Sequence, residues 1–350
     1  MKNRPATVTD VAALARVSTA TVSRALNPSS AELVSSEARE RVFAAAAKLD
    51  YAANHAARSL KTRSTRTVAI LAPEFANEFF MELAEGMERE LEKSGYMLLV
   101  ASSVNSQEEE AKRLALLSRR LVDGIVVIPA GKRGDHLQAI SDRGTPVVLV
   151  DRLVEGAKLD AVLSDNEEGA FCLTRALLMD GLTRVAFVGG DVTISTARER
   201  LSGFARALAE AGFAADSTST RLGGMGIEDG FRRMDEILRA DDPPEALFAV
   251  NLLVHLGMQR RLLQAGTQAD GRPVSARFVL ASFDETPYSP FLPSCRYTAA
   301  QDAAGLGAAA ARLVLDRIRA RGNAAAGEKS VPAEPRIVRL PTTLIRHPRG

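Results

Sequence analysis

A group of short polar side chains stands near the start of the sequence, in the stretch TATVSRAL (residues 19–26). On a helix, Thr19, Ala20, Ser23 and Arg24 would share the face opposite the apolar residues. Short hydroxylic side chains near a helix N-terminus can contact base edges or phosphates without holding the helix away from a DNA groove, and Arg24 can reach phosphate or guanine. The alternative is a packing helix with a face of small residues, and periodicity alone does not decide between the two.

A second group of candidates follows apolar runs that look like buried strands. Ligands of doubly wound sheets bind at the carboxyl ends of strands, so we expect side chains there to meet in a binding site. Phe79 and Phe80, in PEFANEFF, could stack on the apolar face of a sugar or a base, or could instead begin a helix and pack inward. The polar candidates at strand ends are Asp151 in VDR, Asn251 after ALFAV, Asp284 in SFDE and Gln301 in YTAAQD.

Motifs of the common enzyme classes are absent from the sequence. GGMGIEDG reads GxGxxxG through Gly224, Gly226 and Gly230, which is not the GxGxxG dinucleotide fingerprint, and it lies far from the first strand. GxxxxGK[ST], HExxH and GxSxG do not occur. We therefore expect no enzymatic activity and no cofactor.

Composition indicates an ordinary globular protein with an uneven charge distribution. The 350 residues are 46% hydrophobic and 25% charged, with a formal net charge of +2. Residues 1–66 hold eleven Lys and Arg against five Asp and Glu, a net charge of +6, so the remaining residues sum to −4. A small basic module ahead of a slightly acidic body is typical of a nucleic-acid-binding head joined to another domain.

Cysteine and histidine usage argues against a metal site. Cys172 and Cys295 are too few for a disulfide framework and lack a close Cys or His partner, and the four histidines are scattered. The N-terminal stretch has no apolar run of signal-peptide type, and no segment has the roughly 20 apolar residues that cross a bilayer. We expect a cytoplasmic protein without a bound metal.

Three short helices are expected in the basic module. Thr9 can cap the first, with Asp10 in its first turn. Val17 would fill the turn to the second helix, which Ser18 caps, and the third begins near Ser35. The expected buried positions are Val11, Leu14 and Ala15 in the first helix, Val22, Ala25 and Leu26 in the second, and Val42, Ala46 and Leu49 in the third.

After residue 66 the pattern alternates between strands and helices. The expected strands are TVAILAP, YMLLVAS, GIVVIPA and PVVLVDR, then RVAFVGG, ALFAVN and RFVLASFDE after residue 165, with RIVRLPTTLIRH as a final strand. Short runs rich in Val, Ile and Leu are typical of buried parallel strands. We therefore predict an α/β body of two doubly wound subdomains, with the ligand cleft between them.

The basic module resembles a known family of DNA-binding heads. TVTDVAALARVSTATVSRALN, SSEARERVFAAAAKLDY and NHAARSLKTRST are similar, nearly position for position, to the head of the LacI/GalR family of bacterial transcription regulators. The resemblance implies a helix-turn-helix with its second helix in the major groove of double-stranded DNA. It implies base contacts from Thr19 and Ala20, a base or phosphate contact from Arg24, and mainly backbone contacts from Ser18, Thr21 and Asn27.

The stretch NHAARSLK, residues 54–61, spans only about two turns, and an isolated helix of that length is marginal in water. In the family the matching segment is a hinge helix that orders on the operator and places a leucine wedge in the minor groove, which kinks the DNA. One departure is Ala53, which stands where the family usually has proline. The residues implied in this DNA contact are Asn54, Ala57, Leu60 and Lys61.

The body also resembles the family's effector domain, which shares its fold with periplasmic sugar-binding proteins. Arg200, in ARERLSGF, matches the family's cleft arginine, and Asp284 matches its cleft aspartate. Leu252 replaces the aspartate that many members have after Asn251. Arg198, Arg200 and Arg221 together hint at an anionic effector such as a sugar phosphate or a sugar acid.

These observations predict a sequence-specific DNA-binding transcriptional regulator, a repressor controlled by a small, carbohydrate-derived effector between two lobes. We expect a head at residues 1–52, a hinge helix and linker at 53–66, and an effector-binding and dimerisation domain at 67–350. A homodimer would read a pseudo-palindromic operator, and without a leucine heptad tail we expect no tail-linked tetramer. The alternative is a solute-binding protein of the transport type with no DNA role.

Overall fold

The computed structural model describes residues 6–26, 32–51, 64–119, 121–215, 219–325 and 334–348. Contacts divide the chain into two compact units, Met1–Thr65 and Arg66–Gly350. None of the helices in these ranges combines the length and the apolar character needed to cross a membrane. Within the same ranges, no group of three or more His, Cys, Asp or Glu is placed to hold a metal ion.

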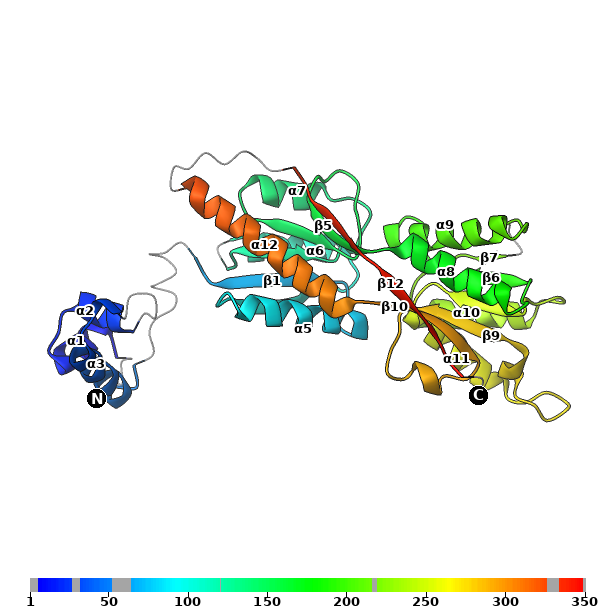
Figure 1. Cartoon of the computed structure of the whole chain (residues 1–350), viewed down its shortest axis with the longest axis horizontal. Coiled ribbons are helices and arrows are strands. Elements are labelled where there is room, and N and C mark those ends of the chain that lie inside the picture. Colours follow the sequence, from blue (N-terminus) through cyan, green and yellow to red (C-terminus); the bar gives the residue numbers. More distant parts are fainter. Residues whose placement is uncertain are drawn as a thin grey trace. The chain divides into compact units, whose positions relative to one another are not determined.

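The first unit holds helices α1 (Val8–Ala15), α2 (Thr19–Ala25) and α3 (Ser36–Lys48) around one small core (Figure 1). Ser18 and Ser35 cap α2 and α3 as expected, each accepting a backbone hydrogen bond from the third residue along. The expected cap of α1 is wrong. Thr7, not Thr9, begins the helix, because Thr7 and Asp10 form a reciprocal capping box.

The core of the first unit differs from the expectation at one position of α1. Val11 and Ala15 are buried as expected, but Leu14 is 43% exposed and Ala12 takes its place. The remaining buried positions of this core are Val22, Ala25, Val42, Ala45 and Ala46.

The second unit contains two sheets of six strands each, and each sheet is covered by helices on both faces. In the first lobe the strand order is β11-β5-β4-β3-β1-β2, and every pair is parallel. Its strands are β1 (Thr67–Ala72), β2 (Met97–Ser102), β3 (Gly124–Val127), β4 (Val147–Val150), β5 (Asp160–Ser164) and β11 (Ile337–Leu340). Its helices are α5 (Glu78–Glu92), α6 (Gln107–Leu117), α7 (Asp135–Asp142) and α12 (Ala303–Ala325).

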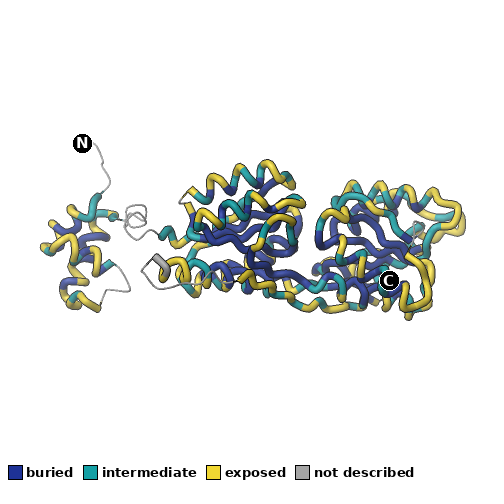
Figure 2. Tube along the Cα trace, turned by 90° about the horizontal axis from the view of Figure 1, so that it is seen from above, coloured by how far each residue is buried: buried dark blue, intermediate teal, exposed yellow. Residues whose placement is uncertain are grey.

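In the second lobe the order is β12-β10-β9-β8-β6-β7, parallel except that β12 runs antiparallel to β10. Its strands are β6 (Val185–Val188), β7 (Thr220–Arg221), β8 (Ala246–Ala249), β9 (Val279–Phe283), β10 (Cys295–Gln301) and β12 (Thr342–Arg346). Its helices are α8 (Asn166–Met179), α9 (Ser195–Glu210), α10 (Ile227–Leu238) and α11 (Leu252–Ala265), with short 3₁₀ turns at Val274–Arg277 and Ser289–Phe291. Figure 2 shows the buried strands inside each lobe and the exposed outer turns of the helices.

The predicted fold class is confirmed, with corrections to the strands. β5 and β7 were not expected, β10 was implied only by the place given to Gln301 at a strand end, and the single final strand is wrong. Its residues form two strands, β11 in one sheet and β12 in the other, separated by Pro341. Proline donates no ladder hydrogen bond, so a strand readily ends there.

Three segments connect the lobes, so neither lobe is one continuous stretch of sequence. They are residues 164–166, 301–303 and 340–342. After the second of them, α12 returns to pack against α5 (Figure 1). This contact is close because Gly86 lies against the backbone of α12, where a Cβ atom would come 2.1 Å from the carbonyl oxygen of Ala304. These connections bring residues far apart in sequence to one boundary between the lobes.

Candidate DNA-reading face and interlobe effector site

The outward face of α2 carries the side chains that the sequence singled out. Thr19, Ala20, Ser23 and Arg24 are exposed, while Val22 and Ala25 are buried in the head core. The helix is therefore fixed from behind and presents short side chains outward, the arrangement that major-groove reading requires.

The other expected DNA contacts divide into two groups. Ser18 is exposed, but its Oγ already accepts a hydrogen bond from the Thr21 backbone nitrogen at 3.1 Å and lies 2.9 Å from Thr21 Oγ1. Thr21 is half-buried. The remaining expected contacts, Asn27, Asn54, Ala57, Leu60 and Lys61, lie outside the described residues.

Two aspartates end strands of opposite lobes in the same unusual backbone conformation. Asp151 follows β4 with φ 68°, and Asp284 follows β9 with φ 74°. Both are about 95% buried. Left-handed backbone at a non-glycine residue costs free energy and clusters at functional sites, where the surrounding structure holds it in place. The side chains at these two strand ends are thus rigidly placed.

Arg200 is buried, and its positive charge interacts with both aspartates. Its Nε donates to Asn166 Oδ1 at 2.8 Å, its Nη1 donates to the Val250 carbonyl at 2.8 Å, and its guanidinium carbon lies 3.7 Å from the centre of the Phe283 ring. Burial lowers the pKa of Arg200, while the charges of Asp284 and Asp151 act in the opposite direction. Burial likewise raises the pKa of Asp151, opposed mainly by neighbouring Arg152. Carboxylates of both lobes therefore balance this cation.

Asp284 and Gln301 join two segments of the second lobe at the cleft. Gln301 Nε2 donates to Asp284 Oδ1 at 2.6 Å, and the Leu252 backbone nitrogen donates to Asp284 Oδ2 at 3.3 Å. Gln301 Oε1 is buried and has no hydrogen-bond partner in the described part of the chain. An acceptor without a donor beside a cleft is a ready site for a ligand hydroxyl or amine.

A small pocket opens between the lobes next to this pair. Of the described residues that line it, four are carboxylates and none is basic. Its lining consists of Glu78, Phe79 and Glu82 from α5, Leu252 from α11, Asp284, Glu285 and Thr286 after β9, and Gln301. Partial burial, together with Glu78, Glu85 and Asp284, raises the pKa of Glu82.

The two candidate aromatic residues have different positions. Both pack in the core of the first lobe, with Phe79 9% and Phe80 2% exposed, and only Phe79 also lines the pocket. The rings meet edge to face with centroids 5.5 Å apart. Phe80 therefore supports Phe79 from behind, and only Phe79 presents a surface to the pocket.

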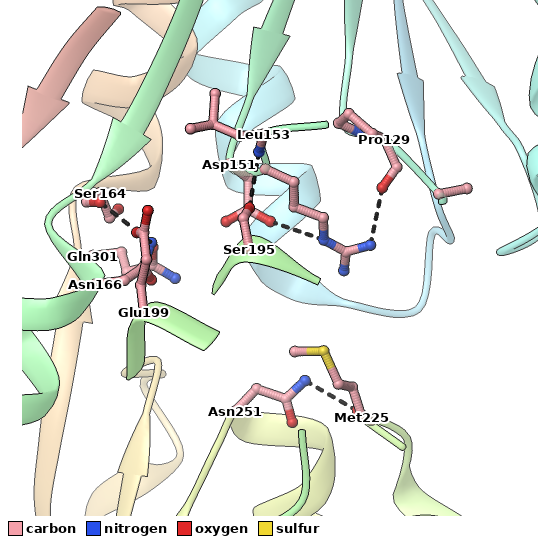
Figure 3. A network of polar contacts seen from close by, with 12 residues as sticks. Pro129, Asp151, Leu153, Ser164, Asn166, Ser195, Glu199, Met225, Asn251 and Gln301 are labelled. Atoms are coloured by element: carbon pink, nitrogen blue, oxygen red, sulfur yellow. Dashed lines mark hydrogen bonds and ion pairs between the residues drawn. The ribbon is translucent and has the colours of Figure 1, made fainter. Parts of the chain in front are cut away.

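Asn251 does not turn its polar groups to the pocket. Its Oδ1 accepts a hydrogen bond from the Val254 backbone nitrogen, which caps α11, and its Nδ2 donates to the Met225 carbonyl at 3.0 Å (Figure 3). Arg198, Arg200 and Arg221, whose charges hinted at an anionic effector, are not among the residues that line the pocket, and neither is Asp151. Arg198 is exposed and donates to the Val192 carbonyl.

Sequence reasoning missed the carboxylates Glu78, Glu82 and Glu285. The spacing of four between Glu78 and Glu82, on either side of Phe79, places both on one side of α5 and could have pointed to them. Glu285 follows Asp284 directly, and its carboxylate is held by Thr298 Oγ1 and by His347 Nε2 at 3.2 Å. Nothing local in the sequence indicates that contact, because His347 comes from beyond β12.

Comparison with known proteins assigns both units. A family model described as "Bacterial regulatory proteins, lacI family" matches residues 7–54. A second, described as "Periplasmic binding proteins and sugar binding domain of LacI family", matches residues 65–347. The chain belongs to the LacI family. A solute-binding protein of the transport type with no DNA role is therefore not retained as an interpretation.

Individual LacI-family proteins match over most of their length. The HTH-type transcriptional repressor PurR of Vibrio campbellii is 30% identical over 90% of this chain and 92% of its own. The structure titled transcriptional regulator CelR-cellobiose complex is 29% identical, covers 97% of this chain and 98% of that one, and has a TM-score of 0.68. Cra of Pseudomonas putida in complex with fructose 1-phosphate is 25% identical, covers 80% and 98%, and has a TM-score of 0.70. Like these relatives, the chain is a DNA-binding regulator with an effector-binding body.

Proposed function

We propose that the chain is a homodimeric repressor whose affinity for its operator is set by an uncharged, hydroxyl-rich effector in the interlobe pocket. The observation that carries this proposal is the charge of the pocket lining, four carboxylates with no basic residue among the described lining residues. Carboxylates accept hydrogen bonds from hydroxyl groups and repel anions. A neutral sugar or nucleoside satisfies such a lining, and Phe79 offers its ring to the apolar face of the ligand.

A sugar phosphate is the second candidate, favoured by the buried guanidinium of Arg200 and by the relative crystallised with fructose 1-phosphate. The charge balance of the cleft argues against a sugar phosphate, because the carboxylates of Asp151 and Asp284 already offset the charge of Arg200. An anionic ligand would have to approach Glu78, Glu82 and Glu285 without a free cation in the lining. The neutral class is therefore the better fit.

DNA reading is proposed for the exposed face of α2. Thr19, Ala20 and Arg24 would contact base edges, with Ser18, Thr21 and Ser23 nearer the phosphates, since the first turn of a recognition helix is its deepest part. The family resemblance adds Asn27 and the hinge residues Asn54, Ala57, Leu60 and Lys61 as contacts. One short helix reads few base pairs, so two copies on a two-fold symmetric operator are needed.

The first lobe offers a surface for the second copy. β2 is an edge strand of its sheet and exposes Met97 and Val100, and the following α6 exposes Leu116. Apolar side chains on an open strand edge favour pairing with another chain. We take this apolar surface, Met97, Val100 and Leu116, as part of the homodimer interface and call it the β2–α6 surface.

The effector class is tested by thermal unfolding of the full chain with neutral sugars, nucleosides, sugar phosphates, sugar acids and nucleobases. A ligand present at 100 times its Kd and bound only to the folded state adds about 2.7 kcal/mol of stability, which raises Tm. We expect the rise with neutral hydroxylated compounds. Asp284→Asn should abolish it, while Asp270→Asn, at an exposed loop position, should preserve it. A rise confined to phosphates or acids, or no rise with any class, would contradict the proposal.

A further inference from the structure

An ion pair joins the two lobes where the chain crosses between them. Arg339 lies on β11 of the first lobe, and Glu199 lies on α9 of the second. Arg339 Nη2 lies 3.1 Å from Glu199 Oε1, and its Nη1 lies 3.3 Å from Glu199 Oε2. The contact with Glu199 raises the pKa of Arg339. Because its two members belong to different lobes, a rotation that moves β11 relative to α9 stretches or breaks this pair.

The carboxylate of Glu199 also contacts the first connecting segment. Asn166 Nδ2 donates to Glu199 Oε2 at 3.3 Å and to the Ser164 carbonyl at 3.2 Å, and Arg339 Nη1 approaches the same carbonyl at 3.4 Å. Asn166 is fully buried. Figure 3 shows Ser164, Asn166 and Glu199 gathered beside Gln301, which belongs to the second connecting segment. Arg339 of the first lobe and Asn166 of the first connecting segment thus meet at one carboxylate of the second lobe.

The other polar atom of the Asn166 side chain contacts Arg200. Its Oδ1 accepts the hydrogen bond from Arg200 Nε, so one amide group holds Glu199 through its nitrogen and Arg200 through its oxygen. Glu199 and Arg200 are adjacent on α9. A shift of Glu199 with its partner Arg339 therefore changes the position of Asn166, and with it the direction of the Arg200 guanidinium.

We propose that Arg339 and Glu199 are positioning residues, which tie the orientation of the buried Arg200 to the angle between the lobes through Asn166. The proposal rests on the proposed function only in taking Arg200, whose charge interacts with Asp284 of the pocket lining, as part of the effector site. In this proposal, lobe rotation and effector binding affect the same contacts, those that link the ion pair to Arg200 through Asn166. Two sites are coupled when both bias one element with two arrangements, and the proposal assigns that part to this network.

An ordinary ion pair would not have this consequence. Arg260 and Glu228 form a two-pronged pair with both distances 2.8 Å, but α10 and α11, which carry them, belong to the same lobe. Lobe rotation leaves that pair intact, and exposed pairs of this kind add little stability. Arg260→Gln is therefore a matched control for Arg339→Gln.

The test uses the full chain without any effector. Spin labels are placed at Glu88→Cys on α5 and Ala209→Cys on α9, both exposed helix positions, in a Cys172→Ser background. Burial raises the pKa of Cys295 to about 12, so this thiol stays unlabelled. Doubly labelled chains are diluted with excess unlabelled chains, and pulsed electron resonance gives the distance distribution within one chain. The Arg200 Nε–H signal, assigned with Arg200→Lys, is followed by nitrogen-15 NMR.

We expect Arg339→Gln and Glu199→Gln each to shift or broaden the distance distribution and to speed solvent exchange at Arg200 Nε–H several-fold. The double variant should resemble either single variant, and Arg339→Lys, which keeps the charge, should resemble the parent. Arg260→Gln should leave both signals unchanged. The proposal is overturned if Arg339→Gln leaves either signal as in the parent, or if Arg260→Gln alters them to the same extent. Because no effector is used, this test distinguishes the two outcomes even if the search for an effector fails.

Discussion

At the scale of single residues, a position at the end of a predicted strand identifies some residues of the interlobe pocket but not all. Asp151, Asp284 and Gln301 were predicted from their places after apolar runs. Asp284 and Gln301 line the pocket between the lobes, while Asp151 lies outside that lining and interacts with Arg152 and Arg200. Asn251 occupies a strand end as well, yet its Oδ1 caps α11 and its Nδ2 donates to the Met225 carbonyl. A strand end predicts where a side chain lies but not which way its hydrogen bonds run, because capping competes for the same amide.

His255 should make stability depend on pH. It is buried, and burial lowers its pKa to about 4, with His347 acting in the same direction. The imidazole is thus neutral when folded, consistent with Gln259 Nε2 lying 3.0 Å from its Nε2. Between pH 6.5 and pH 4 the unfolded chain binds the additional proton, so this residue's contribution lowers stability as pH falls and has no effect above that window.

The expected size of that loss is about 2 kcal/mol between pH 6.5 and pH 4.5. Urea unfolding of the parent and of His255→Leu at both pH values measures it. The parent should lose more stability than the variant by about this amount. Equal losses in the two proteins would show that His255 is not the titrating group.

Among the elements, helix caps and strand breaks were partly readable from the sequence. TVTD contains Thr7 and Asp10 three residues apart, the spacing of a capping box, and this signal identifies the true start of α1. Pro341 within RIVRLPTTLIRH marks the break between β11 and β12 in the same way. The short strand β7, with two residues, has no comparable signal, because its pairing with β6 is set by the surrounding fold.

Helix α2 gives a prediction about the recognition of DNA sequence. If Arg24 contacts a base, Arg24→Ala should weaken binding to the preferred DNA by about 1–3 kcal/mol and relax preference at one position in each half-site. Selection from random duplexes followed by sequencing measures this. Arg39→Ala, at an exposed position on α3, should weaken binding evenly across sequences. If Arg24→Ala keeps the base preference of the parent, Arg24 does not contact a base.

At the scale of the whole molecule, the sequence predicts two α/β lobes but not how the chain divides between them. α12 follows β10 of the second lobe in sequence and packs in the first lobe. The apolar pattern of α12 shows that it is buried, not which sheet covers it, since both sheets present similar faces. The Arg339–Glu199 contact depends on this return of the chain to the first lobe, where β11 carries Arg339, and could not be predicted from residue spacing.

The β2–α6 surface predicts how the chain assembles. Met97→Glu and Leu116→Glu place charges on an apolar interface and should shift the chain from dimer toward monomer, raising the dimer Kd by at least about tenfold. Sedimentation velocity over a range of concentrations measures the shift. Met179→Glu, at an exposed position of α8 in the second lobe, is the control and should leave the dimer intact. Monomeric parent protein at all concentrations would contradict the assembly.

The central claim is that a ligand in the interlobe pocket controls DNA binding. It is tested most directly by fluorescence anisotropy of the selected duplex, titrated with the full chain in the presence and absence of the compound that raises Tm. Coupling free energies between sites are typically 1–3 kcal/mol, so saturating compound should change the DNA Kd by about 5–150-fold. Asp284→Asn should bind the same duplex without responding to the compound. A DNA Kd that is the same with and without saturating compound would contradict the account.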